Sequence, residues 1–101
     1  MSEPVAWLGC TVEVFDADGH VVFGDDDCDV RLEGDLLVVS YFDEEGALVF
    51  SGRQEADGSF DLWCRGRVRR ARVAFDPART HLEGDWREDG AEGRWRIALR
   101  A

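Results

Sequence analysis

Residues 81–100 carry the clearest alternation of apolar and polar side chains in the chain. The positions that share the apolar phase are Leu82, Gly84, Trp86, Trp95, Ile97 and Leu99. Because alternate side chains of a β-strand point to the same face, this period of two predicts a hairpin with one core face. A four-residue loop over 89–92 would place Trp86 opposite Trp95, and Asp85 opposite Arg96 on the outer face.

The most apolar stretch, 36–42, predicts a central strand that pairs with 47–53. A four-residue loop over 43–46 sets the register and places Val39 opposite Phe50 in the core. The opposite face of this hairpin is also largely apolar, and its apolar members are Val38, Phe42, Ala47 and Val49.

The next turn ends at Gly58 and predicts a three-residue hairpin loop with this glycine in the left-handed position. In that register Ser51 lies opposite Trp63, and Arg53 lies opposite Asp61, both on the outer face. Trp63 therefore extends the apolar outer face of the central hairpin.

The first third of the chain predicts a long strand over 5–15, a return strand over 20–23 and a separate short strand over 30–33. The side chains expected to point inward are Leu8, Cys10, Val12, Val14, Val21 and Phe23. The acidic stretch Asp25–Asp29 predicts a solvated loop that contains Cys28. Its aspartates are consecutive, whereas calcium ligands are spaced along a loop, so we assign no metal site there.

The segment 67–75 predicts a strand with Ala71, Val73 and Phe75 facing inward. Val68 falls out of that phase, which indicates a β-bulge near Arg69 and Arg70.

Turn glycines recur about every 8–12 residues, a spacing typical of an all-β sandwich or barrel. We therefore expect residues 1–101 to form one all-β domain of eight or nine short antiparallel strands, either an up-and-down barrel or a two-sheet sandwich. The pattern L-x-G-x-W over 82–86, followed by G-x-W-x-I-x-L over 93–99, resembles strands of small calycin barrels, the avidin and lipocalin class. The resemblance implies a barrel that holds a small hydrophobic ligand in its mouth, although this chain is much shorter than a lipocalin.

Composition narrows the class of protein. The chain lacks an apolar run of membrane-spanning length and a secretion signal, so we expect a cytoplasmic protein without membrane contact. The three cysteines are odd in number, and we expect reduced, buried thiols at Cys10 and Cys64. Residues 1–61 carry a net charge of −14 and residues 62–101 a net charge of +4, which we interpret as acidic strands paired with basic ones. The alternative is a polar electrostatic field that orients assembly.

Residues that would carry catalysis are scarce. The chain has no lysine, and neither His20 nor His81 belongs to a triad or a zinc motif. We therefore expect no enzymatic activity and no cofactor. The basic positions near Trp63 could form a nucleic-acid surface, and they are Arg67, Arg69, Arg70 and Arg72. The net charge of −10 argues against that partner, and pairing with carboxylates is the favoured role.

The outer apolar face predicts protein contacts, either with a second copy in a two-fold dimer or with another protein. The expected interface comprises Val38, Phe42, Ala47, Val49, Trp63 and Arg65. The alternative function is the small-ligand carrier implied by the calycin resemblance. The two hypotheses differ in whether the aromatic side chains of the core leave a cavity.

Overall fold

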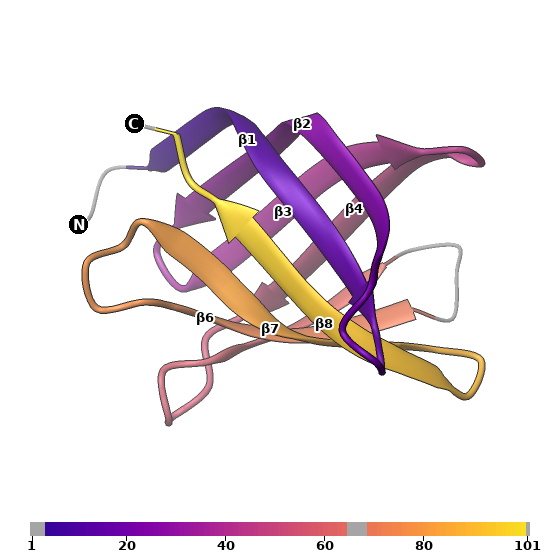
Figure 1. Ribbon diagram of the computed structural model, residues 1–101. Coiled ribbons are helices and arrows are strands. Elements are labelled where there is room, and N and C mark those ends of the chain that lie inside the picture. Colours follow the sequence, from indigo (N-terminus) through magenta and orange to yellow (C-terminus); the bar gives the residue numbers. More distant parts are fainter. Residues whose placement is uncertain (1–3, 65–68, 101) are drawn as a thin grey trace.

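The computed structural model describes residues 4–64 and 69–100, which form a closed barrel of antiparallel strands (Figure 1). The strands are β1 (Val5–Asp16), β2 (Val21–Glu33), β3 (Leu36–Asp43), β4 (Gly46–Arg53), β5 (Phe60–Cys64), β6 (Arg69–Phe75), β7 (His81–Glu88) and β8 (Ala91–Ala98). Each strand pairs with its neighbours in sequence, and β8 closes the barrel on β1. The prediction of an all-β antiparallel barrel is confirmed, and the sandwich alternative is wrong. Among the described residues, no helical segment has the length and apolarity of a membrane span.

The barrel has two ends of different character. The β1–β2, β3–β4 and β7–β8 turns surround one end, which we call the mouth. The β2–β3, β4–β5 and β6–β7 turns surround the other, which we call the closed end, and β1 begins and β8 ends on this side (Figure 1). The buried core between them is apolar throughout the described residues.

Two inward-facing glycines allow the strands to coil tightly around this core. A Cβ at Gly84 would lie 1.8 Å from the carbonyl oxygen of Arg72, and one at Gly52 would lie 1.9 Å from that of Asp61. No side chain fits at such distances, so each glycine permits a close approach of neighbouring backbones.

The predicted registers hold in the centre of the barrel and slip by two residues in the last hairpin. Val39 pairs with Phe50 as predicted, although the connecting turn is the shorter pair Glu44–Glu45. In the last hairpin Trp86 lies opposite Gly93 instead of Trp95, because the turn consists of two residues, Asp89 and Gly90. Both have positive φ, 46° and 81°, as the tight turn favoured by an Asp-Gly sequence requires.

The slip leaves the core face of this hairpin unchanged but alters its ion pairs. Asp85 lies opposite Arg94, and Arg96 instead pairs with Glu83 at 3.4 Å. A shift of two residues preserves which side chains face inward, because the strand period is two.

The first strand departs from the predicted phase. Gly9 has φ of +67°, and the register of β1 against β2 breaks between Trp7 and Cys10. This bulge turns Trp7 toward the core and leaves Leu8 56% exposed, so the inward assignment of Leu8 is wrong. Val21 is likewise exposed, because the register breaks again between Val14 and Phe15.

The acidic stretch Asp25–Asp29 belongs to β2 and is not a loop. Cys28 within it is fully buried opposite Cys10, and desolvation raises the pKa of its thiol well above the ordinary range. Asp29 accepts a hydrogen bond from the backbone N–H of Gly9, and Asp26 accepts one from the hydroxyl of Thr11. The expected buried, reduced thiols at Cys10 and Cys64 are confirmed.

The charge segregation follows the strand order only in part. Glu13 of β1 lies opposite Arg96 of β8, as the pairing of acidic with basic strands predicts. However, β2 lies between β1 and β3, so its aspartates do not border the arginine-rich strands β6–β8. For β2 the interpretation is therefore wrong.

Candidate functional site

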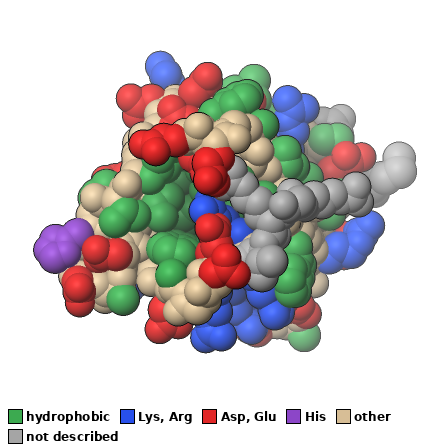
Figure 2. Space-filling model, turned by 90° about the vertical axis from the view of Figure 1, so that its right-hand side faces the viewer, with side chains coloured by type: hydrophobic (Ala, Val, Ile, Leu, Met, Phe, Trp, Pro, Cys, Tyr) green, Lys and Arg blue, Asp and Glu red, His purple; other side chains and the backbone are tan. Residues whose placement is uncertain are grey.

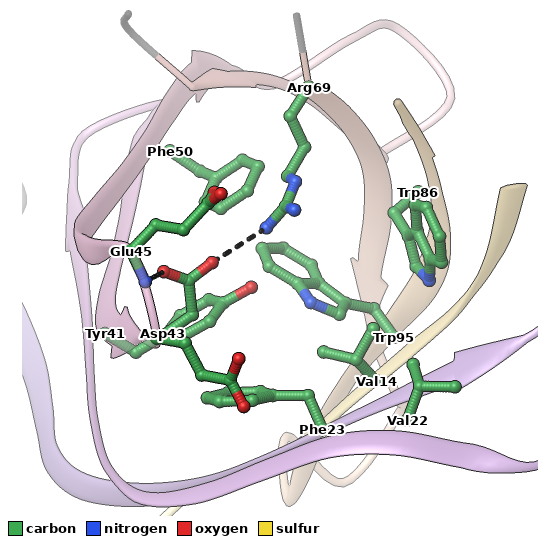
Figure 3. A pocket seen from close by; sticks show the side chains of 11 residues that line it. Val14, Val22, Phe23, Tyr41, Asp43, Glu45, Phe50, Arg69, Trp86 and Trp95 are labelled. Atoms are coloured by element: carbon green, nitrogen blue, oxygen red, sulfur yellow. Dashed lines mark hydrogen bonds and ion pairs between the residues drawn. The ribbon is translucent and has the colours of Figure 1, made fainter. Parts of the chain in front are cut away.

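A pocket of about 300 Å³ lies at the mouth of the barrel. Figure 2 shows this end hollowed, with hydrophobic and basic atoms inside and acidic side chains around the rim. The residues that line the pocket are Val14, Val22, Phe23, Tyr41, Asp43, Glu44, Glu45, Phe50, Arg69, Trp86 and Trp95 (Figure 3).

The floor of the pocket is a cluster of buried aromatic rings. The rings of Phe50 and Trp95 meet edge to face at a centroid distance of 4.7 Å, and Tyr41 stacks on Phe50 at 6.1 Å. Phe23 lies against Tyr41 at 5.7 Å. Tyr41, Phe50 and Trp95 are each at most 3% exposed, so neighbouring side chains hold the floor in place.

The sequence places these rings at the mouth through plain strand alternation. Tyr41 and Phe50 follow Val39 and Leu48 in the inward phase of β3 and β4. Trp95 precedes Ile97 in the inward phase of β8. Tyr41 and Trp95 therefore lie one inward step closer to the mouth than Val39 and Ile97. Phe50 lies one step deeper than Leu48, because β4 runs away from the mouth, and pairs with Val39.

Three charged side chains form the layer above this floor. Arg69 Nη1 lies 3.8 Å from Asp43 Oδ2 (Figure 3). The Nε–H of Arg69 donates a hydrogen bond to the carboxylate of Glu88. Burial disfavours the charge of Arg69, but the hydrogen bond to Glu88 and the nearby carboxylates outweigh it and raise the pKa of this guanidinium. Arg69 therefore stays charged inside the mouth.

Tyr41 places its phenol beside this charged layer. Burial raises the pKa of Tyr41 to about 12, against smaller opposing effects of hydrogen bonds with Trp95 and Arg69. The phenol is therefore protonated at neutral pH and cannot act there as a phenolate base.

Trp86 forms a side wall and has its own polar group satisfied. Its indole N–H donates to the carbonyl oxygen of Phe15 at 3.0 Å. Gly93, opposite Trp86, makes room for the ring, since a Cβ at Gly93 would lie 2.7 Å from the indole nitrogen. The pairing of Trp86 with Gly93, which differs from the predicted register, therefore allows Trp86 to line the pocket.

The residues of the predicted interface that the structure describes lie on the outside of β3, β4 and β5, and none of them lines the pocket. Phe42, Val49 and Trp63 are 62%, 48% and 54% exposed, Ala47 is exposed and Val38 is half-buried. We call these five residues the outer apolar face. Arg65, the sixth predicted member, lies outside the described residues.

The polar rim of this face differs from the predicted Arg53–Asp61 pair. Arg53 pairs with Asp35 at 2.5 Å, whereas Asp61 accepts hydrogen bonds from Arg70, at 2.7 Å from its Nε. The guanidinium of Arg70 also lies 4.6 Å from the ring centre of Trp63. Trp63 is therefore partly covered by a cation–π contact within its own chain.

The predicted basic surface is divided between the inside and the outside of the barrel. Arg69 points into the mouth, because β6 pairs regularly from its first residue and the expected bulge near Arg69 is absent there. Arg70 and Arg72 point outward and pair with Asp61 and Asp57. Arg67 lies outside the described residues.

The β1–β2 turn brings one group of metal-ligating side chains together in the described part of the chain. Ligand atoms of Asp16, Asp18 and His20 lie within 4.8 Å of one another. Asp16 Oδ1 already accepts the backbone N–H groups of Asp18 and His20 at 3.0 and 2.9 Å, and these bonds lower its pKa, that of His20 most. The arrangement is that of an exposed turn cap.

The charged layer was not predicted, although the sequence carries a signal for it. Asp43 ends the inward phase of β3, Glu88 ends that of β7, and Arg69 begins that of β6. On three strands, the inward-facing position nearest the same end of the barrel is charged. This pattern indicates a polar layer at that end. The bulge that was expected near Arg69 hid this pattern.

No protein-family model, no curated protein sequence and no solved structure matches the chain. The features of this chain that bear on its function are the pocket at the mouth and the outer apolar face.

Proposed function

We propose that this protein binds a small, largely apolar molecule in the mouth of its barrel. The observation that carries the proposal is the pocket of about 300 Å³ with its floor of Tyr41, Phe50 and Trp95. Pockets for small ligands are typically concave, mostly apolar and supplied with a few polar groups. An eight-stranded barrel is also just wide enough to hold one small ligand.

The rigidity of the floor supports binding. Its rings pack against one another without a ligand, so little side-chain entropy is lost when a ligand arrives. The charged layer above is internally paired through Arg69, Asp43 and Glu88. Because these charges are already paired with one another, the aromatic rings are the surface that remains for a ligand to contact.

Two neighbouring residues of β2 provide a matched test of this proposal. Val22 lines the pocket and Val21 does not, and the two are similarly exposed, at 59% and 55%. The uncharged dye N-phenylnaphthylamine should bind the wild type with stoichiometry of one and increased dye fluorescence. Val22→Asp should weaken binding by about tenfold, because an apolar contact of roughly 1.4 kcal/mol is lost. Val21→Asp should leave the affinity unchanged.

Two results would contradict ligand binding at the mouth. One is a wild type that shows no saturable dye binding. The other is equal weakening by the Val21 and Val22 substitutions, which would place the dye elsewhere on the surface.

A second function, self-association through the outer apolar face, is supported by a different observation. Phe42, Val49 and Trp63 are large apolar side chains on adjacent strands, and each is about half exposed or more. Such clusters on a soluble protein commonly mark an interface. We propose a two-fold dimer as its simplest form.

Light scattering tests self-association. Phe42→Glu and Trp63→Glu should convert a dimer into a folded monomer that melts cooperatively. Leu8→Glu, at an exposed apolar residue on β1, should remain dimeric and serves as the control. A wild type that stays monomeric at high concentration would remove this second function.

A further inference from the structure

The polar groups of the mouth are already paired with one another. Arg69 contacts both Asp43 and Glu88, and the indole N–H of Trp86 donates to a backbone carbonyl. Among the described residues, every buried side-chain nitrogen and oxygen has a hydrogen-bond partner. A charged group on a ligand would therefore have to compete with an existing contact.

The charges around the pocket disfavour an anionic ligand. Asp43, Glu44 and Glu45 line the pocket against one described cation, Arg69, and the whole chain carries a net charge of −10. A carboxylate would approach against this field and would compete with Asp43 and Glu88 for Arg69.

A cationic ligand is disfavoured by desolvation. An ammonium group that reaches the aromatic floor loses its water and needs a paired carboxylate in return. Asp43 and Glu88 are engaged by Arg69, and Glu44 and Glu45 are exposed residues of the β3–β4 turn. What the pocket offers without competition is the aromatic surface of its floor and walls.

The size of the pocket sets the size of the ligand. Its volume of about 300 Å³ is roughly twice the ~150 Å³ of an apolar cavity that binds one benzene. Two fused aromatic rings match this volume. The rings of Phe50 and Trp95 meet at 65° and so present both an edge and a face, which are the two favourable contacts for another aromatic ring.

We propose that the mouth binds an uncharged molecule built on two fused aromatic rings, in preference to the corresponding carboxylate or amine. This inference rests on the proposed binding of a small molecule at the mouth and specifies its chemistry.

Three probes that share one ring system test the inference: indole, indoleacetate and tryptamine. Each is titrated by calorimetry and in competition with N-phenylnaphthylamine. Indole should bind with stoichiometry of one and displace the dye, and the two charged probes should bind at least about tenfold more weakly. The affinity for indole should not change with salt concentration, because no net charge is transferred.

Tyr41 provides an independent reading of where indole binds. It is the single tyrosine of the chain, so tyrosinate absorbance reports on this side chain alone. Indole on the floor should move the titration midpoint of Tyr41 further upward, because its rings block the side from which water could solvate the phenolate. The shift should be lost in Val22→Asp and kept in Val21→Asp.

The outcomes separate this inference from the proposed function. Indoleacetate or tryptamine that binds as tightly as indole overturns the inference and leaves small-molecule binding intact. Dye binding that none of the three probes displaces overturns the two-ring class in the same way. Absence of dye binding and of indole binding overturns both.

Discussion

At both ends of the barrel, alternate side chains of each strand point inward, but the outermost inward side chains differ in polarity. At the closed end, the inward side chains of the outermost layers are apolar. Trp7 packs against Phe75 at a ring distance of 5.5 Å, and Phe60 meets Phe75 edge to face at 5.9 Å. At the mouth, the outermost inward positions are Asp43, Arg69 and Glu88 in place of apolar residues.

This difference explains why only one end carries the aromatic-floored pocket. Apolar side chains gain free energy by closing over one another, so the closed end is packed. Charged side chains lose free energy if water is removed from all of their polar atoms, so they must remain partly exposed. Side chains of Asp43, Arg69 and Glu88 are between 16% and 30% exposed. The charged layer therefore keeps the mouth open above a floor that is itself dry.

The comparison predicts that truncations at the closed end destabilise the barrel more than truncations at the mouth. Phe60→Ala should lower the free energy of unfolding by about 3–5 kcal/mol, because this ring is fully buried. Trp86→Ala should lower it by less, about 1–3 kcal/mol, because Trp86 is only partly buried beside the pocket. Urea denaturation measures both values. Equal losses would mean that the mouth is packed as tightly as the closed end.

The charged layer itself is tested by Arg69→Met, which keeps the length of the side chain and removes its charge. We expect a loss of about 1–2 kcal/mol, less than for a fully buried pair because these groups are partly solvated. The loss arises because Asp43 and Glu88 are left without the cation between them. It should shrink at high salt concentration, where interactions between partly exposed charges are screened. A loss that is independent of salt concentration would indicate a packing defect instead.

Much of the barrel follows from the sequence by simple periodicity. The core positions of β3, β4 and β5 and the pairing of Val39 with Phe50 were predicted correctly, because regular alternation and glycine turns determine them. The errors occur where one residue changes the local geometry. Gly9 introduces a bulge, and the Asp89–Gly90 pair makes a tighter turn than the predicted loop.

The pocket was less accessible from sequence than the core. Its aromatic floor was predicted to be inward, but the volume of the pocket depends on how side chains from seven strands pack, and alternation does not report packing. The charged layer had a sequence signal in Asp43, Arg69 and Glu88, yet Arg69 was read as part of an outer basic surface. The period of two identifies the face of the sheet on which a residue lies. To predict which residues it contacts across the barrel, one must also know the register of every hairpin between them.

One turn at the closed end should make the stability of the barrel sensitive to acid. Asp76 caps the β6–β7 turn at the closed end, and hydrogen bonds from the hydroxyl of Thr80 and the backbone N–H of His81 lower its pKa to about 2. A carboxyl whose pKa is lower in the folded state stabilises the fold above its unfolded pKa near 4. That stabilisation is lost as the pH falls toward 2.

Melting temperatures measured between pH 5 and about pH 2 test this cap. Asp76→Asn should reduce the melting temperature at pH 5 and flatten its fall in acid, because the linked proton uptake is removed. Thr80→Val should do the same to a smaller extent, since it removes only the hydroxyl donor. An Asp76→Asn variant whose melting temperature falls as steeply as that of the wild type would show that other carboxylates control acid unfolding.

The smallest predicted effect concerns the bulge that supplies the closed end with one of its large rings. Gly9 turns Trp7 inward and Leu8 outward, so Leu8→Ser should change the free energy of unfolding by no more than about 0.5 kcal/mol. Val12→Ser, at a fully buried position of the same strand, should instead cost at least about 2 kcal/mol, because a hydroxyl replaces packed methyl groups. Urea denaturation of the two variants compares them directly. If Leu8→Ser destabilised the protein as much as Val12→Ser, β1 would run without its bulge, Leu8 would occupy the core, and Trp7 would no longer help to seal the closed end.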